Sequence, residues 1–205
     1  MSIKKNILET KSLAVGYQQN KSVAIIQQDI NLQLLAGEFV TILGKSTLLR
    51  TLTKVQEPIS GDVFLQQKKI QSYSLKELSM TISLVLTEKL PESQLTVFEL
   101  VALGRQPYTN CIGKLQENDI ERITSALKLT ETDDLAQKHF HELSDGQLQR
   151  VLIARALAQD TKIIMLDEPT AHLDMHHTIK IFQLLKKLSK ETKKTIIITT
   201  HEVNL

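Results

Sequence analysis

The stretch that most constrains the fold is residues 163–174, I-I-M-L-D-E-P-T-A-H-L-D. Four apolar residues lead into two adjacent acids, Asp167 and Glu168, and Pro169 then stops the strand. Such a run favours a strand covered on both faces in a parallel sheet, although its periodicity also allows a buried helix. Ligands bind at the carboxyl ends of strands in open α/β sheets, where one acid suits a metal and the other a reacting water. The alternative is a strand that merely ends in two solvated acids.

The composition is that of a soluble globular protein, with 41% hydrophobic and 23% charged residues among 205. A formal net charge of +2 comes from 25 basic and 23 acidic residues spread along the chain, which argues against nucleic-acid binding. No apolar run approaches the roughly 18–20 residues that cross a bilayer, and the first residues lack the apolar core of a signal peptide. We therefore expect a cytosolic chain. The single cysteine, Cys111, excludes an internal disulfide and a cysteine-rich metal site.

The region from residue 7 to residue 43 is predicted to be mostly β. Apolar residues alternate over residues 30–34, which predicts a half-buried strand, and Gly37 separates it from a second strand at residues 38–43. A helix is predicted next, because apolar side chains at positions 48, 49, 52 and 55 have helical spacing. Further strands are expected at residues 59–66 and 82–86.

The residues between that strand and that helix are Gly44, Lys45, Ser46 and Thr47. A strand, this short sequence and a helix form the context of the phosphate-binding loop G-x-x-x-x-G-K-[ST], in which backbone N–H groups, a lysine and a hydroxyl surround phosphates and magnesium. Only the G-K-S end of the motif is present, and Phe39 occupies the position of its first glycine. By itself this short sequence is weak evidence for a phosphate-binding loop, because a lysine before a helix start is common.

Residues 88–155 are predicted to form a helical subdomain inserted between core strands. Thr96 caps its first helix, residues 104–113 form a loop, and Ser144 with Gln147 has the S-x-x-Q spacing of a capping box. A helix start with a serine and a glycine also presents N–H groups to an anion, and the alternative is an ordinary capped helix. The apolar positions that define these helices are Val97, Leu100, Val101, Leu103, Ile120, Ile123, Leu127, Leu148, Val151 and Leu152.

Two further side chains stand where a ligand could meet them. An amphipathic helix over residues 181–188 and a second buried strand, T-I-I-I-T-T, precede His201. A histidine at the carboxyl end of a strand is either catalytic or a packing or surface residue. Tyr17 stands beside the polar turn V-G-Y-Q-Q-N-K, where an aromatic ring either packs or stacks on a ligand.

The order and spacing of G-K-S-T, L-S-D-G-Q, I-I-M-L-D-E, A-H-L-D and T-T-H-E resemble the ATP-binding subunit of an ABC transporter over nearly the whole chain. The resemblance implies the α/β fold of a P-loop NTPase of the ABC ATPase type: a mainly parallel sheet core, an N-terminal antiparallel β subdomain and an inserted helical subdomain. It implies one domain over residues 1–205, in which residues 88–155 are the helical subdomain with the signature motif and residues 1–87 and 156–205 are the rest. We expect the C-terminal end of the domain to lie outside this sequence.

The resemblance also implies roles at the nucleotide. Gly44, Lys45, Ser46 and Thr47 match the phosphate loop, with Ser46 on Mg²⁺, and Tyr17 matches the aromatic residue that stacks on adenine. Asp167 matches the acid that holds Mg²⁺, and Glu168 matches the general base that polarises the attacking water. His201 matches the switch histidine that contacts the γ-phosphate.

The remaining implied roles concern a second subunit. Ser144, Gly146 and Gln147 match the signature motif, which in this family contacts ATP bound to the opposite subunit. Asp174 lies in the loop that connects the two sites. The resemblance therefore implies a homodimer that binds MgATP between its subunits, and one chain alone should be a poor ATPase.

The sequence departs from the family pattern at three places. Asp145 stands where the family most often has glycine, and Thr87 stands where it usually has a glutamine that contacts magnesium. The third departure is the phosphate loop, from which five residues of the eight are missing. Either the deletion is genuine and no phosphate cradle exists, or this sequence lacks five residues between Gly44 and Lys45. We favour the second interpretation, because the other nucleotide-binding elements are present.

Residues 95–110, L-T-V-F-E-L-V-A-L-G-R-Q-P-Y-T-N, resemble the helical-subdomain stretch of importers for iron chelates, haem and cobalamin, and the alternative is a simple loop. The resemblance implies a subunit that hydrolyses MgATP to power such an importer, bound peripherally to the cytoplasmic face of the membrane. Its implied partners are transmembrane permease subunits and, indirectly, a substrate-binding protein. The alternatives are a soluble ABC ATPase of another process and a non-hydrolysing nucleotide-sensing subunit.

Overall fold

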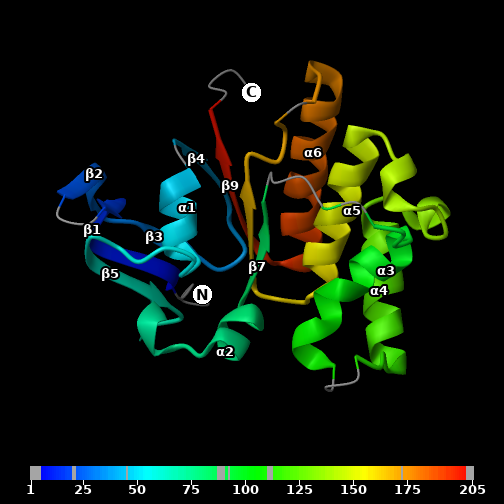
Figure 1. The fold of residues 1–205 in the computed structure, drawn as a ribbon, viewed down its shortest axis with the longest axis horizontal. Helices are drawn as coiled ribbons and strands as arrows, with labels where there is room; N and C mark the ends of the chain where they lie inside the picture. Colours follow the sequence, from blue (N-terminus) through cyan, green and yellow to red (C-terminus); the bar gives the residue numbers. More distant parts are fainter. Residues whose placement is uncertain are drawn as a thin grey trace.

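The structure, a computed structural model, describes residues 6–19, 22–44, 46–86, 91, 93–109, 113–171 and 173–201. An antiparallel sheet and a parallel sheet lie on either side of helix α1, and the longer helices cover the other face of the parallel sheet (Figure 1). None of the described helices combines the length and the apolarity that crossing a bilayer requires. The helices, with short 3-10 helices labelled η, are α1 (Ser46–Leu52), η1 (Ile70–Ser72), α2 (Leu75–Ser79), α3 (Val97–Ala102), η2 (Leu103–Tyr108), α4 (Glu117–Leu129), η3 (Asp133–Leu135), η4 (Phe140–Glu142), α5 (Asp145–Ala158) and α6 (Met175–Thr192).

The antiparallel sheet has the strand order β2-β1-β5-β6, and β3 also pairs with β1. The predicted single strand over residues 30–34 is wrong, because Ile30 ends β2 and Leu34 belongs to β3. The chain turns around the hydroxyl of Thr10, which donates to the carbonyl of Ile30 and accepts from the N–H of Leu32. The strands are β1 (Asn6–Gln19), β2 (Ser22–Ile30), β3 (Gln33–Leu35), β5 (Ser60–Leu65) and β6 (Lys68–Lys69).

The parallel sheet has the strand order β4-β9-β8-β7, and each neighbouring pair is parallel. Every residue of β8 and of β9 is buried, which confirms that the two apolar runs form strands covered on both faces. The buried-helix alternative for residues 163–167 is therefore excluded. The strands are β4 (Phe39–Leu43), β7 (Ile82–Val85), β8 (Ile163–Asp167) and β9 (Thr195–Thr200).

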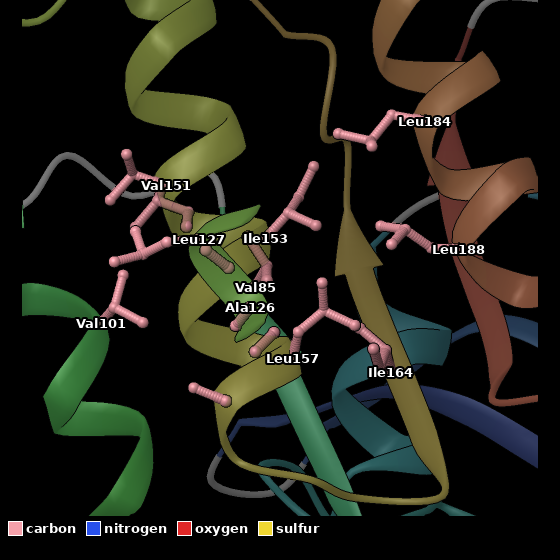
Figure 2. Close-up of a cluster of buried hydrophobic side chains, with 14 of the residues drawn as sticks. Val85, Val101, Ala126, Leu127, Val151, Ile153, Leu157, Ile164, Leu184 and Leu188 are labelled. Atoms are coloured by element: carbon pink, nitrogen blue, oxygen red, sulfur yellow. The ribbon is translucent and has the colours of Figure 1, made fainter. Parts of the chain in front are cut away.

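The two faces of β8 belong to two different hydrophobic cores. Ile163 and Met165 pack in the core that contains α1 and the antiparallel sheet. Ile164 and Leu166 point the other way, into the core that α3, α4, α5 and α6 share with this sheet (Figure 2). Because successive side chains of a strand alternate between faces, a continuous apolar run is what such a central strand requires.

Helix α1 is shorter than the sequence predicted. It ends at Leu52, and Val55, predicted to lie on its apolar face, is 62% exposed. Lys54 adopts a left-handed backbone with φ of 60°, which ends the helix, and its ammonium donates to the carbonyls of Gln71 and Tyr73. A local pattern of apolar residues does not reveal such contacts with a distant segment, so it could not predict where the helix ends.

The predicted capping boxes are present. The hydroxyl of Thr96 accepts from the N–H of Glu99 at the start of α3, and Ser144 with Gln147 does the same at the start of α5. The loop predicted at residues 104–113 is only partly correct, because Leu103–Tyr108 forms the 3-10 helix η2.

Arg105 connects η2 to two neighbouring helices. Its side chain is 4% exposed, its Nε donates to Asp119 at 2.9 Å, and its Nη1 donates to the carbonyl of Ala158 at 2.8 Å. The guanidinium also lies 4.0 Å from the centre of the Tyr108 ring. One buried cation thereby joins η2, α4 and the end of α5.

Asp119→Ala is expected to lower the free energy of unfolding by about 3–5 kcal/mol, because it leaves the Arg105 guanidinium buried and unpaired. The backbone N–H of Gln116, followed by the Arg105 side chain, lowers the pKa of Asp119. A lowered pKa in the folded state means that this stabilisation is complete above about pH 4, the value of an unfolded aspartate, and is lost as the pH falls through the lower folded pKa. Urea unfolding of parent and variant at several pH values measures both effects. Asp62→Ala, which breaks an exposed pair with Lys69, is the control and should cost less than about 1 kcal/mol.

Candidate functional site

The carboxyl ends of β4, β8 and β9 bring the main candidate residues to one edge of the parallel sheet. Leu43 pairs with Thr200, and Asp167 pairs with Thr199, so that Gly44, Glu168 and His201 each follow a strand end at neighbouring positions. The N–H of Gly44 donates to the carbonyl of Thr200 at 3.4 Å. The sequence predicted these residues as separate motifs, and the sheet places them side by side.

The two adjacent acids have different surroundings. Asp167 ends β8, is 2% exposed and accepts a hydrogen bond from the hydroxyl of Thr199 at 2.7 Å. Glu168 leaves the strand with a left-handed φ of 45°, a conformation that costs a side-chain-bearing residue energy and that often marks functional sites. Its side chain is 30% exposed. One acid is therefore fixed inside the protein and the other reaches the open edge.

Glu168 contacts the predicted switch histidine. The Nε2 of His201 lies 2.9 Å from Oε1 of Glu168, and the histidine side chain is 56% exposed. This exposure does not fit a packing residue, and it is compatible with both the catalytic interpretation and the alternative of a surface residue. The alternative of two solvated acids is also wrong, because Asp167 is buried.

Thr199 organises both acids and was missed by the sequence reasoning. Its hydroxyl donates to Asp167 and accepts from the N–H of Glu168 at 3.1 Å, and the side chain is fully buried. The signal was present in the two threonines of T-T-H-E, because a hydroxyl at the end of a buried strand needs a hydrogen-bond partner. Finding it required knowing that β9 lies beside β8.

Thr199→Val is expected to lower the free energy of unfolding by about 1–3 kcal/mol, because it leaves the buried Asp167 carboxylate without this donor. Valine preserves the shape and the β-branched side chain, so the effect isolates the hydroxyl. Urea unfolding at pH 7 measures it. Thr41→Val, at an exposed position of β4, is the matched control and should change stability by less than about 0.5 kcal/mol. Equal losses in the two variants would contradict the organising role of Thr199.

Tyr17 stands at the other side of α1. Its ring is 46% exposed, and its hydroxyl lies 3.2 Å from the hydroxyl of Thr47. The ring also lines a cavity of about 370 Å³ beside the end of α1. A half-exposed aromatic ring tied to the first turn of α1 leaves a face that a planar ligand could stack on.

The connection between β4 and α1 is short. β4 ends at Leu43 and α1 begins with the half-buried Ser46, so only two residues separate the strand from the helix. Gly44 has a φ of 146°, which favours glycine. Lys45 lies outside the described residues, as does Thr87, so neither prediction about these two side chains can be placed in the structure.

A second group of candidate residues lies at the starts of α5 and α6, at the same end of the molecule as the carboxyl ends of β8 and β9 (Figure 1). Ser144 caps α5, and the Oε1 of Gln147 accepts from its N–H at 3.0 Å. Asp174 caps α6 through the N–H of His177, and this bond and the imidazole of His177 lower the pKa of Asp174. Gly146 is buried. These hydrogen bonds stay within the start of each helix and do not reach Asp167 or Glu168.

The fold and the site together define a class of protein. A parallel sheet that presents a helix start with hydroxyls, a buried aspartate, a partly exposed glutamate and a histidine at one edge is typical of nucleoside triphosphatases. The sequence profile of the ABC transporter family matches residues 27–171. The chain belongs to the ABC transporter family.

Individual relatives are similar over almost the whole chain. The iron(3+)-hydroxamate import ATP-binding protein FhuC of Bacillus subtilis is 37% identical over 204 residues, which cover 97% of this chain and 74% of that protein. The ferric enterobactin transport ATP-binding protein FepC of Escherichia coli is 36% identical over 202 residues, which cover 96% and 73%.

Solved structures agree with this relationship. The structure of cbiO1 from Clostridium perfringens, part of the ABC transporter complex cbiONQ, has a TM-score of 0.82 at 33% identity and covers 97% of this chain and 80% of that one. The dimeric post-hydrolysis state of the ATP-binding cassette MJ0796, bound to ADP and Pi, has a TM-score of 0.79 at 32% identity, over 96% and 89%.

These similarities confirm the predicted fold class and the predicted resemblance to ATP-binding subunits of iron-siderophore importers. They also confirm the predicted class of enzyme, an ATPase whose hydrolysis is coupled to transport. The roles of single site residues and the subdomain boundaries are not tested by them and stay predictions.

Proposed function

We propose that this chain is the MgATP-binding and hydrolysing subunit of an importer for an iron chelate, with haem and cobalamin as the alternative cargoes. The observation that carries the proposal is the edge of the parallel sheet, where Asp167, Glu168 and His201 lie together beside the start of α1. The names of the iron-hydroxamate and enterobactin relatives favour the iron chelate.

The residues at the edge suit Mg²⁺. This ion prefers hard oxygen ligands, and it is usually bound by one or two carboxylates together with substrate phosphates rather than by a closed protein site. Asp167 supplies a preoriented carboxylate and Ser46 a hydroxyl, while no cluster of three or more acids, histidines and cysteines exists among the described residues. Bound Mg²⁺ would neutralise charge on the phosphate oxygens.

Glu168 is the residue that we assign to the attacking water. Its side chain is partly exposed at the edge, unlike that of Asp167, so it is able to orient a water and accept its proton. His201 contacts that carboxylate, and we assign its imidazole to the γ-phosphate. Tyr17 is assigned to stack on adenine, with Gly44, Lys45, Ser46 and Thr47 around the phosphates.

Ser144, Gly146, Gln147 and Asp174 are assigned to the nucleotide of a second subunit. They lie at helix starts, where N–H groups favour an anion, and their own bonds stay within α5 and α6. We propose a homodimer that closes on ATP beneath two transmembrane permease subunits, with a substrate-binding protein delivering the cargo. The chain would then lie on the cytoplasmic face of the membrane.

We also propose that the chain is divided into a helical part and a remainder that contains both sheets. Residues 88–155 form the helical part, and residues 1–87 and 156–205 form the rest. Helix α5 extends from Asp145 to Ala158, so the proposed boundary at residue 155 falls in the last turn of this helix. The helix packs on the sheet as well as on α3 and α4, so it would transmit movement between the two parts.

A specific observation favours a second candidate function. The connection between β4 and α1 has only two residues, which is too short to wrap N–H groups around a phosphate. A genuine deletion would favour a nucleotide-sensing subunit that does not hydrolyse ATP.

Transport in reconstituted vesicles tests the proposal. The chain is co-purified with its permease subunits from a detergent extract and supplied with ATP and a labelled ferric hydroxamate, haem or cobalamin. ATP-dependent uptake of the ferric hydroxamate supports the iron-chelate assignment, and uptake of haem or cobalamin alone would change the cargo. ATP binding without turnover in the complex would favour the nucleotide-sensing function.

A further inference from the structure

The first turn of α6 holds the side chain of His177 in one position. The backbone N–H of His177 donates to Oδ1 of Asp174 at 2.8 Å. Its ring Nδ1 lies 2.8 Å from Oδ2 of the same carboxylate, which can only accept, so Nδ1 is the donor. One carboxylate therefore fixes both the backbone and the imidazole of His177, although 48% of that side chain is exposed.

The imidazole of His177 occupies the space in front of Gly146, in the first turn of α5. A Cβ added to Gly146 would lie 2.9 Å from Cδ2 and 3.6 Å from Nε2 of the ring. Glycine weakens a helix relative to alanine, and its φ here is not positive, so the backbone does not require it. The need for glycine comes from the ring, which can turn away only by giving up its bond to Asp174.

We propose that His177 is a positioning residue that fixes the start of the signature helix α5 relative to the Asp174 loop. The inference rests on the proposed function, in which both places face the nucleotide of the second subunit. A link of fixed length between them means that the Asp174 loop and the Gly146 N–H approach that nucleotide as one unit. His177 itself contacts neither the nucleotide nor the acids of its own site in this proposal.

A double-mutant cycle without nucleotide tests the contact. Gly146→Ala is expected to lower the melting temperature by roughly 3–8 °C, because the added methyl group strains the ring and its bond. In a His177→Ala background the same change should cause no loss, since the space is open and alanine favours a helix. His176→Ala is the matched control. His176 is a neighbouring exposed histidine, but none of its atoms is among the three nearest the added Cβ, so this substitution should not rescue Gly146→Ala. Additive effects of Gly146→Ala and His177→Ala would overturn the proposal.

A second measurement separates positioning from a general structural defect. In a chain that binds ATP, His177→Ala should leave the affinity of the monomer for ATP unchanged and weaken ATP-driven dimerisation by about tenfold. Glutamine at this position, which can still bond to Asp174, should restore part of the dimerisation. Equal losses of ATP binding and dimerisation would overturn the positioning role. If the chain binds no ATP even after five residues are inserted between Gly44 and Lys45, the proposed function fails, and the melting cycle alone decides whether His177 fixes Gly146.

Discussion

Inserting five residues between Gly44 and Lys45 is expected to raise the affinity for ATP by about 10²–10⁴-fold. The insertion Ala-Asn-Gly-Ser-Gly creates the pattern G-x-x-x-x-G-K-S, in which successive N–H groups turn toward phosphate oxygens. Each hydrogen bond to a charged group contributes about 1.5–3 kcal/mol, so the recovery of two such bonds gives this range. In the structure only two residues connect Leu43 to Ser46, and they cannot surround a phosphate.

Titration calorimetry with MgATP, on the original and the extended chain, measures this gain. The extended chain with Lys45→Ala is the control, because it keeps the longer loop but removes the cation, and it should lose most of the gain. If the original chain already binds MgATP as tightly as the extended chain does, the short connection does not limit ATP binding. If the natural protein has an intact mass equal to that of this 23.2 kDa sequence, the deletion in the loop is genuine.

The parts of the fold that the sequence predicted best are those with a strong local pattern. Four apolar residues lead residues 163–167, three isoleucines lie at the centre of residues 195–200, and both segments are buried strands. The starts of α3 and α5 were predicted correctly because a capping box is built from residues only three positions apart. Local chemistry determines such features, so a sequence alone reveals them.

The errors arose where distant contacts decide the backbone. Thr10 divides the predicted strand over residues 30–34, and Lys54 ends α1 early by bonding to a segment some twenty residues away. Arg105 turns half of a predicted loop into η2 through Asp119 and the end of α5. None of these partners is a neighbour in the sequence.

The candidate site was predictable as a set of residues but not as an arrangement. The acids and His201 were identified by type and order, whereas their contact depends on β9 lying between β4 and β8. Strand order is a tertiary property, and for this reason the role of Thr199 stayed hidden. The contact of His177 with Gly146 was hidden for the same reason, because it joins two helices.

Glu168→Gln, made in the extended chain, is expected to lower ATP turnover by about 10²–10⁴-fold, the usual contribution of a general base. Glutamine keeps the length of the side chain and its bond partner His201, but an amide does not accept a proton from water. Because this change leaves the proposed phosphate and Mg²⁺ contacts in place, ATP binding should persist. If hydrolysis is the step that separates the subunits, ATP-bound dimers should then accumulate.

Phosphate release and size-exclusion chromatography in MgATP measure turnover and dimer formation on the same samples. Asp167→Asn is the informative comparison: it removes the carboxylate assigned to Mg²⁺, so it should weaken MgATP binding itself and prevent the dimer from accumulating. The Glu168 variant would then fail at hydrolysis, after MgATP has bound, whereas the Asp167 variant would fail at the binding of MgATP. That difference follows from their geometry, since Asp167 is buried against Thr199 whereas Glu168 turns out toward His201. Identical behaviour of the two variants would contradict the separate roles assigned to them.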